Sequence, residues 1–299
     1  MVGTVLRGGP ALRTPAVQVA GAVLREKLRT VRRHERGVRA ADLDAVHDMR
    51  VGTKRLRESM RLFRPVLPRA RAKRYLRTID RLNDTLGQAR DPDVLLVALA
   101  DLEQVCACPG RLSSVTERLR TQRVEAQANV VACLDGLEQS RFWRRFRRFT
   151  DRLRETSERT TVWRLAQEVV PDRLMRALEL EPAARRPDAP EALHRLRITV
   201  KRVKYAIEPF RALFDGALDP AYVLISDLQD ALGDTHDADV LLGLLQPVAD
   251  TATEDAAAVA CCVEVIHKRR GARFQDALML LDEMRERDVA HLLLDPLDH

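Results

Sequence analysis

Two segments of the sequence carry the same basic side chains at the same spacing. In each segment His, Arg and Lys recur at i, i+3 and i+7, and a further cation follows at i+10. The two sets are His47, Arg50, Lys54 and Arg57, and His194, Arg197, Lys201 and Lys204. In a helix of about 3.6 residues per turn, these positions share one face. Guanidinium groups present a planar fork to phosphate oxygens, and lysine presents a compact charge. The pattern predicts two halves of a site for an extended anion.

An apolar stripe adjoins each basic stripe on the same predicted helix. Its members are Met49, Leu56, Met60, Leu196, Val203 and Ile207. Arg61 extends the first basic stripe, whereas Glu208 interrupts the second, and Arg55 and Arg202 lie on the flanks. Because the stripes adjoin, we expect the cations to line a groove between helices, where they repel one another and an anion relieves the repulsion. The alternative is a solvated helix face whose arginines pair with nearby carboxylates.

The elements that position these side chains are predicted to be helices almost throughout. Apolar residues recur at intervals of three and four residues, and no strand-like alternation is present. The dominant residue types are Leu, Ala, Arg and Glu. Helix ends are predicted at 36–37, 65–68, 87–92, 108–110, 181–190, 215–220 and 233–237, where Gly, Pro and turn residues cluster. The sequence therefore predicts an all-α fold.

A second block of sequence is also repeated. Residues 82–96 match residues 228–242, and Arg120 and Arg123 match His267 and Arg270. These colinear matches predict an internal duplication, with halves at 16–154 and 160–299 after a flexible N-terminal arm at 1–15. Each half is long enough for a core of its own.

The second block contains six aspartates, namely Asp84, Asp91, Asp93, Asp230, Asp237 and Asp239. The favoured interpretation is capping: Gly87 and Gly233 end one helix, and Asp91 and Asp237 begin the next. Salt bridges to the basic stripes and a magnesium site are the alternatives. The segment 141–149 alternates aromatics and arginines, which is typical either of single-stranded nucleic-acid binding or of an amphipathic helix. The helical spacing of its phenylalanines favours the amphipathic helix.

The composition narrows the classes of partner that the protein is expected to bind. The 299-residue chain has a formal net charge of +7, which favours polyanions. No apolar run reaches the roughly 18 residues of a membrane span, and no membrane partner is expected. The five cysteines include no CxxC pair, so we interpret them as buried apolar residues in a reducing cytoplasm. No nucleotide-binding, zinc or hydrolase motif occurs. We therefore expect a protein that is not an enzyme and has no cofactor, metal or catalytic residue.

The duplicated basic helix and the Leu-Gly-x-x-x-Asp-x-Asp-Val block together resemble the CHAD domain, the conserved histidine α-helical domain, from about residue 16 onward. This resemblance implies a two-part helical bundle with pseudo-two-fold symmetry and a central basic groove or channel that binds inorganic polyphosphate. The implied contacts are His47, Arg50, Lys54, Arg55, Arg57, His194, Arg197, Lys201, Arg202 and Lys204, with Arg61, Arg120, Arg123, His267 and Arg270 as further candidates.

The resulting expectation is a polyphosphate-binding protein of the cytoplasm that associates with polyphosphate granules. Sulfate or phosphate is expected to mimic the ligand, and nucleic acid to compete more weakly. The first alternative is a nucleic-acid-binding protein that uses the same cations. The second is a metal-dependent phosphohydrolase that uses the Asp-x-Asp blocks. Oligomeric state, chain-length preference and the role of the histidines do not follow from the sequence.

Overall fold

The computed structural model describes residues 13–156, 160–251 and 255–298, and nearly all of them lie in helices. The helices are α2 (Ala16–Arg33), α3 (Glu35–Arg39), α4 (Leu43–Leu62), η1 (Arg64–Val66), α5 (Arg69–Val105), α6 (Ser113–Gln139), α7 (Phe142–Arg154), α8 (Val162–Ala184), α9 (Pro190–Ile207), η2 (Arg211–Leu213), α10 (Asp219–Ala249), α11 (Ala256–Glu286) and α12 (Val289–Asp298). The described residues form no named strand, and an isolated bridge joins Pro15 to Thr161. The predicted all-α class is confirmed.

Local chemistry explains where two of the helices begin. The Asp42 side chain accepts a hydrogen bond from the backbone N–H of Ala45, at 2.9 Å, at the start of α4. Thr161 caps α8 in the same way by accepting from the N–H of Arg164, at 3.2 Å. Each cap satisfies a backbone donor that the first helical turn leaves free, which is worth about 1 kcal/mol.

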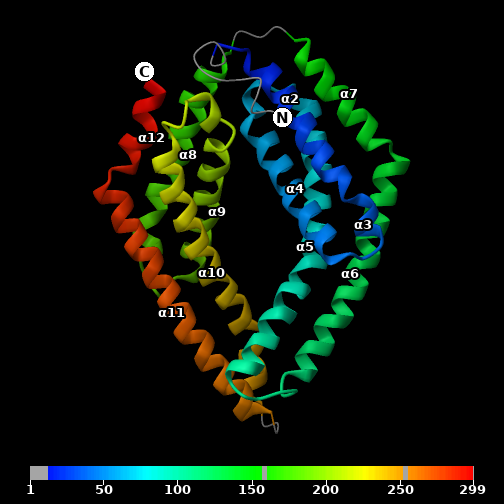
Figure 1. Ribbon diagram of the computed structural model, residues 1–299, viewed down its shortest axis with the longest axis vertical. Coiled ribbons are helices and arrows are strands. Elements are labelled where there is room, and N and C mark those ends of the chain that lie inside the picture. Colours follow the sequence, from blue (N-terminus) through cyan, green and yellow to red (C-terminus); the bar gives the residue numbers. More distant parts are fainter. Residues whose placement is uncertain (1–12, 157–159, 252–254, 299) are drawn as a thin grey trace.

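The helices form two sets that lie side by side (Figure 1). In the first set α2 packs on α4 and α7, α4 packs on α5, and α5 packs on α6. In the second set α8 packs on α9 and α12, α9 packs on α10, and α10 packs on α11. Helices α4 and α9, which carry the two basic stripes, contact each other between the sets. The same order of packing in both sets supports the predicted duplication, which stays a prediction.

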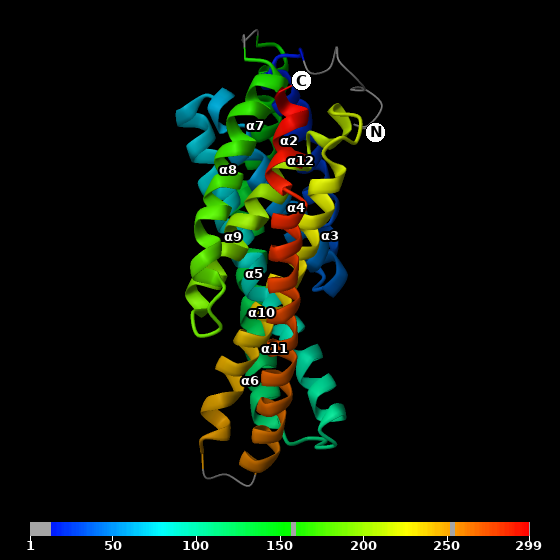
Figure 2. The same cartoon turned by 90° about the vertical axis from the view of Figure 1, so that its left-hand side faces the viewer.

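Two apolar cores hold the sets together. The larger one takes residues from all the helices α2–α12, and therefore from both sets. The smaller core, which we call the distal core, joins α5 and α6 to α10 and α11 at the end where these long helices converge (Figures 1 and 2). It includes Leu99, Leu112, Leu245 and Val259, all at most 1% exposed. Both cores thus cross the predicted boundary between the halves.

The predicted helix ends at 87–92 and 233–237 are wrong. Helix α5 continues through Gly87 and Pro92, and α10 continues through Gly233. A mid-helix glycine costs about 1 kcal/mol and a mid-helix proline more. Tertiary packing overrides this cost, because the face of α5 stays buried on both sides of the break, at Leu86 and Leu99. The interpretation of Asp91 and Asp237 as helix caps is therefore wrong as well.

The aromatic and basic segment 141–149 forms the first part of α7. Phe142, Trp143, Phe146 and Phe149 are buried, as the amphipathic interpretation predicts. The cysteine prediction holds in part. Cys108 and Cys262 are buried in the distal core with their sulfurs 3.8 Å apart, whereas Cys106 and Cys133 are half-buried and Cys261 is exposed. Within the described ranges, no helix combines the length and apolar character needed to cross a bilayer.

Candidate functional site

The contact between α4 and α9 brings Lys54 and Lys201 together. Their side chains lie in contact with each other, and both are half-buried. Burial lowers the pKa of Lys54, and burial with the charge of Lys54 lowers the pKa of Lys201 to about 7. Removing an ammonium group from water disfavours its charged form, and a neighbouring cation disfavours it further. Loss of a proton from Lys201 near neutral pH therefore relieves the repulsion between the two amines.

Three arginines surround this lysine pair. The charges of Arg57 and Arg197 lower the pKa of both lysines, and the charge of Arg50 lowers the pKa of Lys54. Arg50 and Arg197 occupy matching positions of the two stripes, and each has a buried Nε without a hydrogen-bond partner. Burial also lowers the pKa of Arg197. We call Arg50, Lys54, Arg57, Arg197 and Lys201 the central cluster; the protein leaves the buried Nε donors of Arg50 and Arg197 unsatisfied.

A cavity of about 670 Å³ opens beside the central cluster. Arg50, Lys54 and Arg197 form its basic wall. Helices α5 and α10 supply the rest of the lining, which is mostly acidic or apolar; the residues are Asp91, Val94, Leu95, Ala98, Gln229, Asp230, Gly233, Asp234, His236, Asp237, Val240 and Leu241. Arg50 pairs with Asp91 at 2.8 Å, so part of the positive charge is compensated within the protein.

Arg57 of the central cluster and most of the remaining cations of the two stripes are paired with carboxylates. Arg57 and Arg61 donate to the buried Glu58 at 3.1 and 3.0 Å, and Arg61 also pairs with Asp80 at 3.1 Å. Lys204 lies 3.9 Å from Asp230, and Arg55 lies 3.9 Å from Glu208 across the two sets of helices. Arg202 is exposed on α9. The expectation of a basic groove thus fits Lys54, Arg197 and Lys201, whereas the alternative of paired helix faces fits Arg55, Arg57, Arg61 and Lys204.

The matched candidates on α6 and α11 lie away from the central cluster. Arg123 binds Asp93 with Nε and Oδ1 2.5 Å apart, and Arg270 binds Asp239 in the equivalent way. Arg120 and His267 are exposed, and Arg120 lies 3.5 Å from Glu117. Together with the Arg50–Asp91 pair, these contacts show that Asp91, Asp93 and Asp239 of the second block bind arginines rather than cap helices. Within the described ranges, no group of three or more His, Cys, Asp or Glu side chains is placed to hold a metal ion.

The two predicted histidines differ in their surroundings. His47 is exposed, whereas His194 lies with its Nδ1 3.4 Å from the Nδ1 of His236. Burial, reinforced by the charge of Arg197, lowers the pKa of His236 to about 4, so this imidazole is neutral at neutral pH. Sequence reasoning missed His236, although it occupies the place in the second block that Arg90 occupies in the first.

Two further side chains of this region escaped the sequence pattern. Tyr205 lies among Arg55, Arg57 and Glu208, and burial raises its pKa to about 12. Arg173 of α8 donates to the backbone carbonyl of Arg202 at 2.9 Å, and burial lowers its pKa. Tyr205 follows Lys204 directly and could have been found from the second stripe, but Arg173 lies outside both repeated motifs.

Comparisons with known proteins identify the fold. The family model of the CHAD domain matches residues 22–246. The crystal structure of the CHAD domain from the plant Ricinus communis is similar, with a TM-score of 0.66 and 24% sequence identity over 96% of this chain and 93% of that one. PptA from Streptomyces chartreusis is similar as well, with a TM-score of 0.68 and 15% identity over 90% of this chain and 100% of that one. No curated protein matches.

Proposed function

The chain belongs to the CHAD domain family, and from this membership we propose that it binds inorganic polyphosphate at the central cluster between α4 and α9. The observation that carries the proposal is the contact between Lys54 and Lys201, with Arg50, Arg57 and Arg197 around it. Like charges that are held together away from water repel each other, and a bound anion offsets this repulsion because it attracts each of them. The cluster is therefore suited to an anion and to little else.

A chain of phosphates fits the distribution of these cations. They come from two facing helices, so that an anion can be contacted from both sides, and the free Nε donors of Arg50 and Arg197 suit phosphate oxygens. Among the described residues that line the cavity, none is Phe, Tyr or Trp, so a nucleic-acid base finds no stacking partner there. This favours an anion without bases over DNA or RNA, which stays the alternative.

We expect binding without turnover, in the cytoplasm and on polyphosphate granules. In this role the protein holds the chain by electrostatic attraction and counterion release. The affinity should therefore fall steeply with salt concentration. Phosphate release from polyphosphate in the presence of Mg²⁺ or Mn²⁺ would instead support the alternative of a phosphohydrolase.

Titration calorimetry with long-chain polyphosphate tests the proposal. The double variant Lys54→Glu/Lys201→Glu should bind at least about ten-fold more weakly, because charge-assisted contacts contribute about 1.5–3 kcal/mol each. The matched control is Arg118→Glu/Lys268→Glu, which makes the same formal charge change at two exposed positions on α6 and α11. Wild-type affinity in a correctly folded Lys54→Glu/Lys201→Glu protein would contradict the site. Displacement of polyphosphate by RNA at equal phosphate concentration would favour the nucleic-acid alternative.

A further inference from the structure

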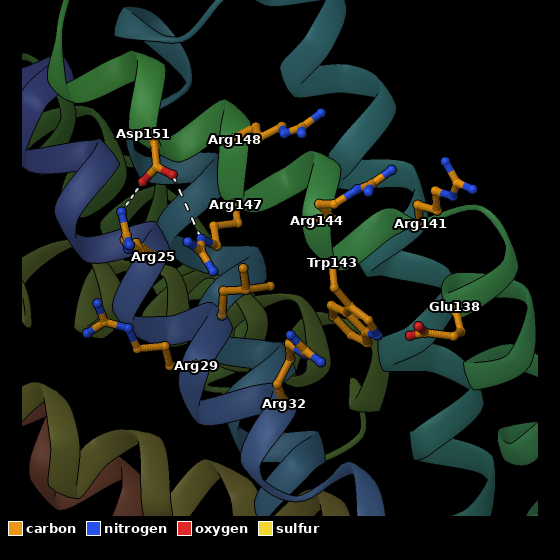
Figure 3. Close-up of a pocket in the computed structure, with 11 residues that line it drawn as sticks. Arg25, Arg29, Arg32, Glu138, Arg141, Trp143, Arg144, Arg147, Arg148 and Asp151 are labelled. Carbon is orange, nitrogen blue, oxygen red and sulfur yellow. Dashed lines mark hydrogen bonds and ion pairs between the residues drawn. The ribbon is translucent and has the colours of Figure 1, made fainter.

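A second basic groove lies between α2 and α7, entirely within the first set of helices (Figure 3). Its cavity has a volume of about 710 Å³. Helix α2 contributes Arg25, Arg29 and Arg32 to its lining. Helix α7 contributes Arg144, Arg147 and Arg148, and Arg141 lies directly before it. We call this cavity the α2–α7 groove; it shares no lining residue with the cavity beside the central cluster.

The charges of the α2–α7 groove are poorly compensated. Seven guanidinium groups face two carboxylates, those of Glu138 and Asp151. Asp151 is already engaged by Arg25 and, at 4.0 Å, by Arg147. The other five arginines form no ion pair with any residue in the described part of the chain; they are Arg29, Arg32, Arg141, Arg144 and Arg148. An incoming anion therefore meets free donors that need not be released from a carboxylate first.

Trp143 gives independent evidence that a ligand belongs in the α2–α7 groove. The residue is only 4% exposed, and its indole Nε1 is buried without a hydrogen-bond partner. Figure 3 shows the indole among the residues that line the cavity, next to Arg32, whose guanidinium carbon lies 6.0 Å from the ring centroid. A buried N–H donor without a partner costs about 1–3 kcal/mol, which a ligand oxygen in the groove would recover.

The fold does not require these cations. Helix α8 packs on α12 as α2 packs on α7. Buried residues recur at the same spacing in α2 and α8, and this spacing aligns Leu24 with Val170 and Leu28 with Leu174. In this alignment the groove arginines of α2 correspond to Pro171, Met175 and Leu178. Asp288 directly precedes α12 and takes the place of Arg141, which directly precedes α7. Both residues have a positive φ, which is 45° at Asp288 and 53° at Arg141. The equivalent surface of the second set thus folds without the arginines.

We propose that the α2–α7 groove is a second anion site, which binds a compact oligophosphate group. Several guanidinium forks around one cavity suit a ligand with several phosphates close together. Trp143 presents an N–H donor but no open ring face, since it is almost fully buried, so the groove does not suit a nucleic-acid base. The phosphates belong either to a free small molecule or to one stretch of a polyphosphate chain. The inference uses no residue of the central cluster and goes beyond the proposed function.

Calorimetry with tripolyphosphate tests this site, and the variant Arg29→Glu/Arg144→Glu removes two of its unpaired cations. Binding should weaken by at least about ten-fold. The matched control is Arg33→Glu/Arg145→Glu, which makes the same charge change outside the groove, one turn after Arg29 on α2 and directly after Arg144 on α7. Equal losses in both variants would show general electrostatic attraction and overturn the site, and wild-type binding by Arg29→Glu/Arg144→Glu would overturn it too.

Trp143 supplies a direct readout and separates the two sources of phosphate. Tripolyphosphate should change tryptophan fluorescence in the Lys54→Glu/Lys201→Glu protein, and Trp143→Phe should abolish this change and weaken binding by removing the N–H. A change of fluorescence only with long-chain polyphosphate would assign the groove to a stretch of that chain. No change of Trp143 fluorescence with either ligand would contradict the proposal. Because the assay uses a protein without the central lysines, its outcome is independent of the test of the proposed function.

Discussion

Lys54 of α4 and Lys201 of α9 are in side-chain contact, although each is an amine that ordinarily carries a positive charge. Their positions match between the two repeated segments, and the contact forms where the two sets of helices meet. The protein therefore holds together two groups that favour separation. A strained charge pair of this kind makes predictions about pH, about stability and about neighbouring residues.

Polyphosphate affinity should fall as the pH rises through 7. The pKa of Lys201 is about 7 in the free protein, and a bound anion raises it, so binding takes up a proton above this pH. Calorimetry in buffers of different ionisation enthalpy measures this uptake. The control Lys201→Arg carries a permanent charge and should lose most of the pH dependence. The same pH profile in both proteins would contradict the assignment of the titration to Lys201.

The ligand-free protein should gain stability as the pH rises above 7. The folded-state pKa of Lys201 is about 7, whereas an unfolded lysine titrates near 10.4, so the unfolded chain binds more protons between these values. The free energy of unfolding then rises with pH, by at most about 1.4 kcal/mol per pH unit for one group. Urea unfolding should show this slope in the wild type and a smaller one in Lys201→Met. At pH 7 or below the Met variant should be the more stable protein; an equally stable or weaker variant would argue against repulsion at this pair.

Asp91→Asn should strengthen polyphosphate binding about two- to five-fold. Asp91 competes with the ligand for Arg50, which it contacts at 2.8 Å, and its side chain is 58% exposed. Losing an exposed ion pair costs at most about 1 kcal/mol of stability. Asp84→Asn, on the same helix at an exposed position outside the cavity lining, controls for the change of net charge. Equal gains in the two variants would show a long-range effect without a role for Arg50.

Arg123→Ala should destabilise the protein much more than it weakens binding. Its partner Asp93 is only 7% exposed, so the change leaves a buried carboxylate without its closest counter-ion. Losses of about 3 kcal/mol are typical of such truncations. Urea unfolding and calorimetry of the same samples separate the two effects. Arg120→Ala, at a 65% exposed position on the same helix, should change neither. A loss of affinity in Arg123→Ala without a loss of stability would place Arg123 in the binding site.

The sequence pattern predicted which helix faces are basic and which are apolar, because a regular period encodes a face. It could not predict which cations stay free. Arg50 and Arg123 belong to repeated motifs alike, yet Arg123 is bound by a buried aspartate from another helix, and only the packing of α5 on α6 determines that contact. The continuity of α5 through Gly87 and Pro92 escaped prediction for a related reason. Burial along the whole helix outweighs the low helix propensities of these two residues. Trp143 belongs to the segment 141–149 that was predicted as an amphipathic helix, but its unpaired N–H is visible only in three dimensions.

The distal core determines how the central cluster can respond to a ligand. Leu99 of α5 is buried in the same cluster as Leu245 of α10 and Val259 of α11, so apolar surface from both sets is removed from water there. This burial, remote from Lys54 and Lys201, resists the separation that their repulsion favours. The cations are preorganised as a result: the work of bringing them together is done during folding, and an anion that arrives needs little rearrangement of the helices to be bound.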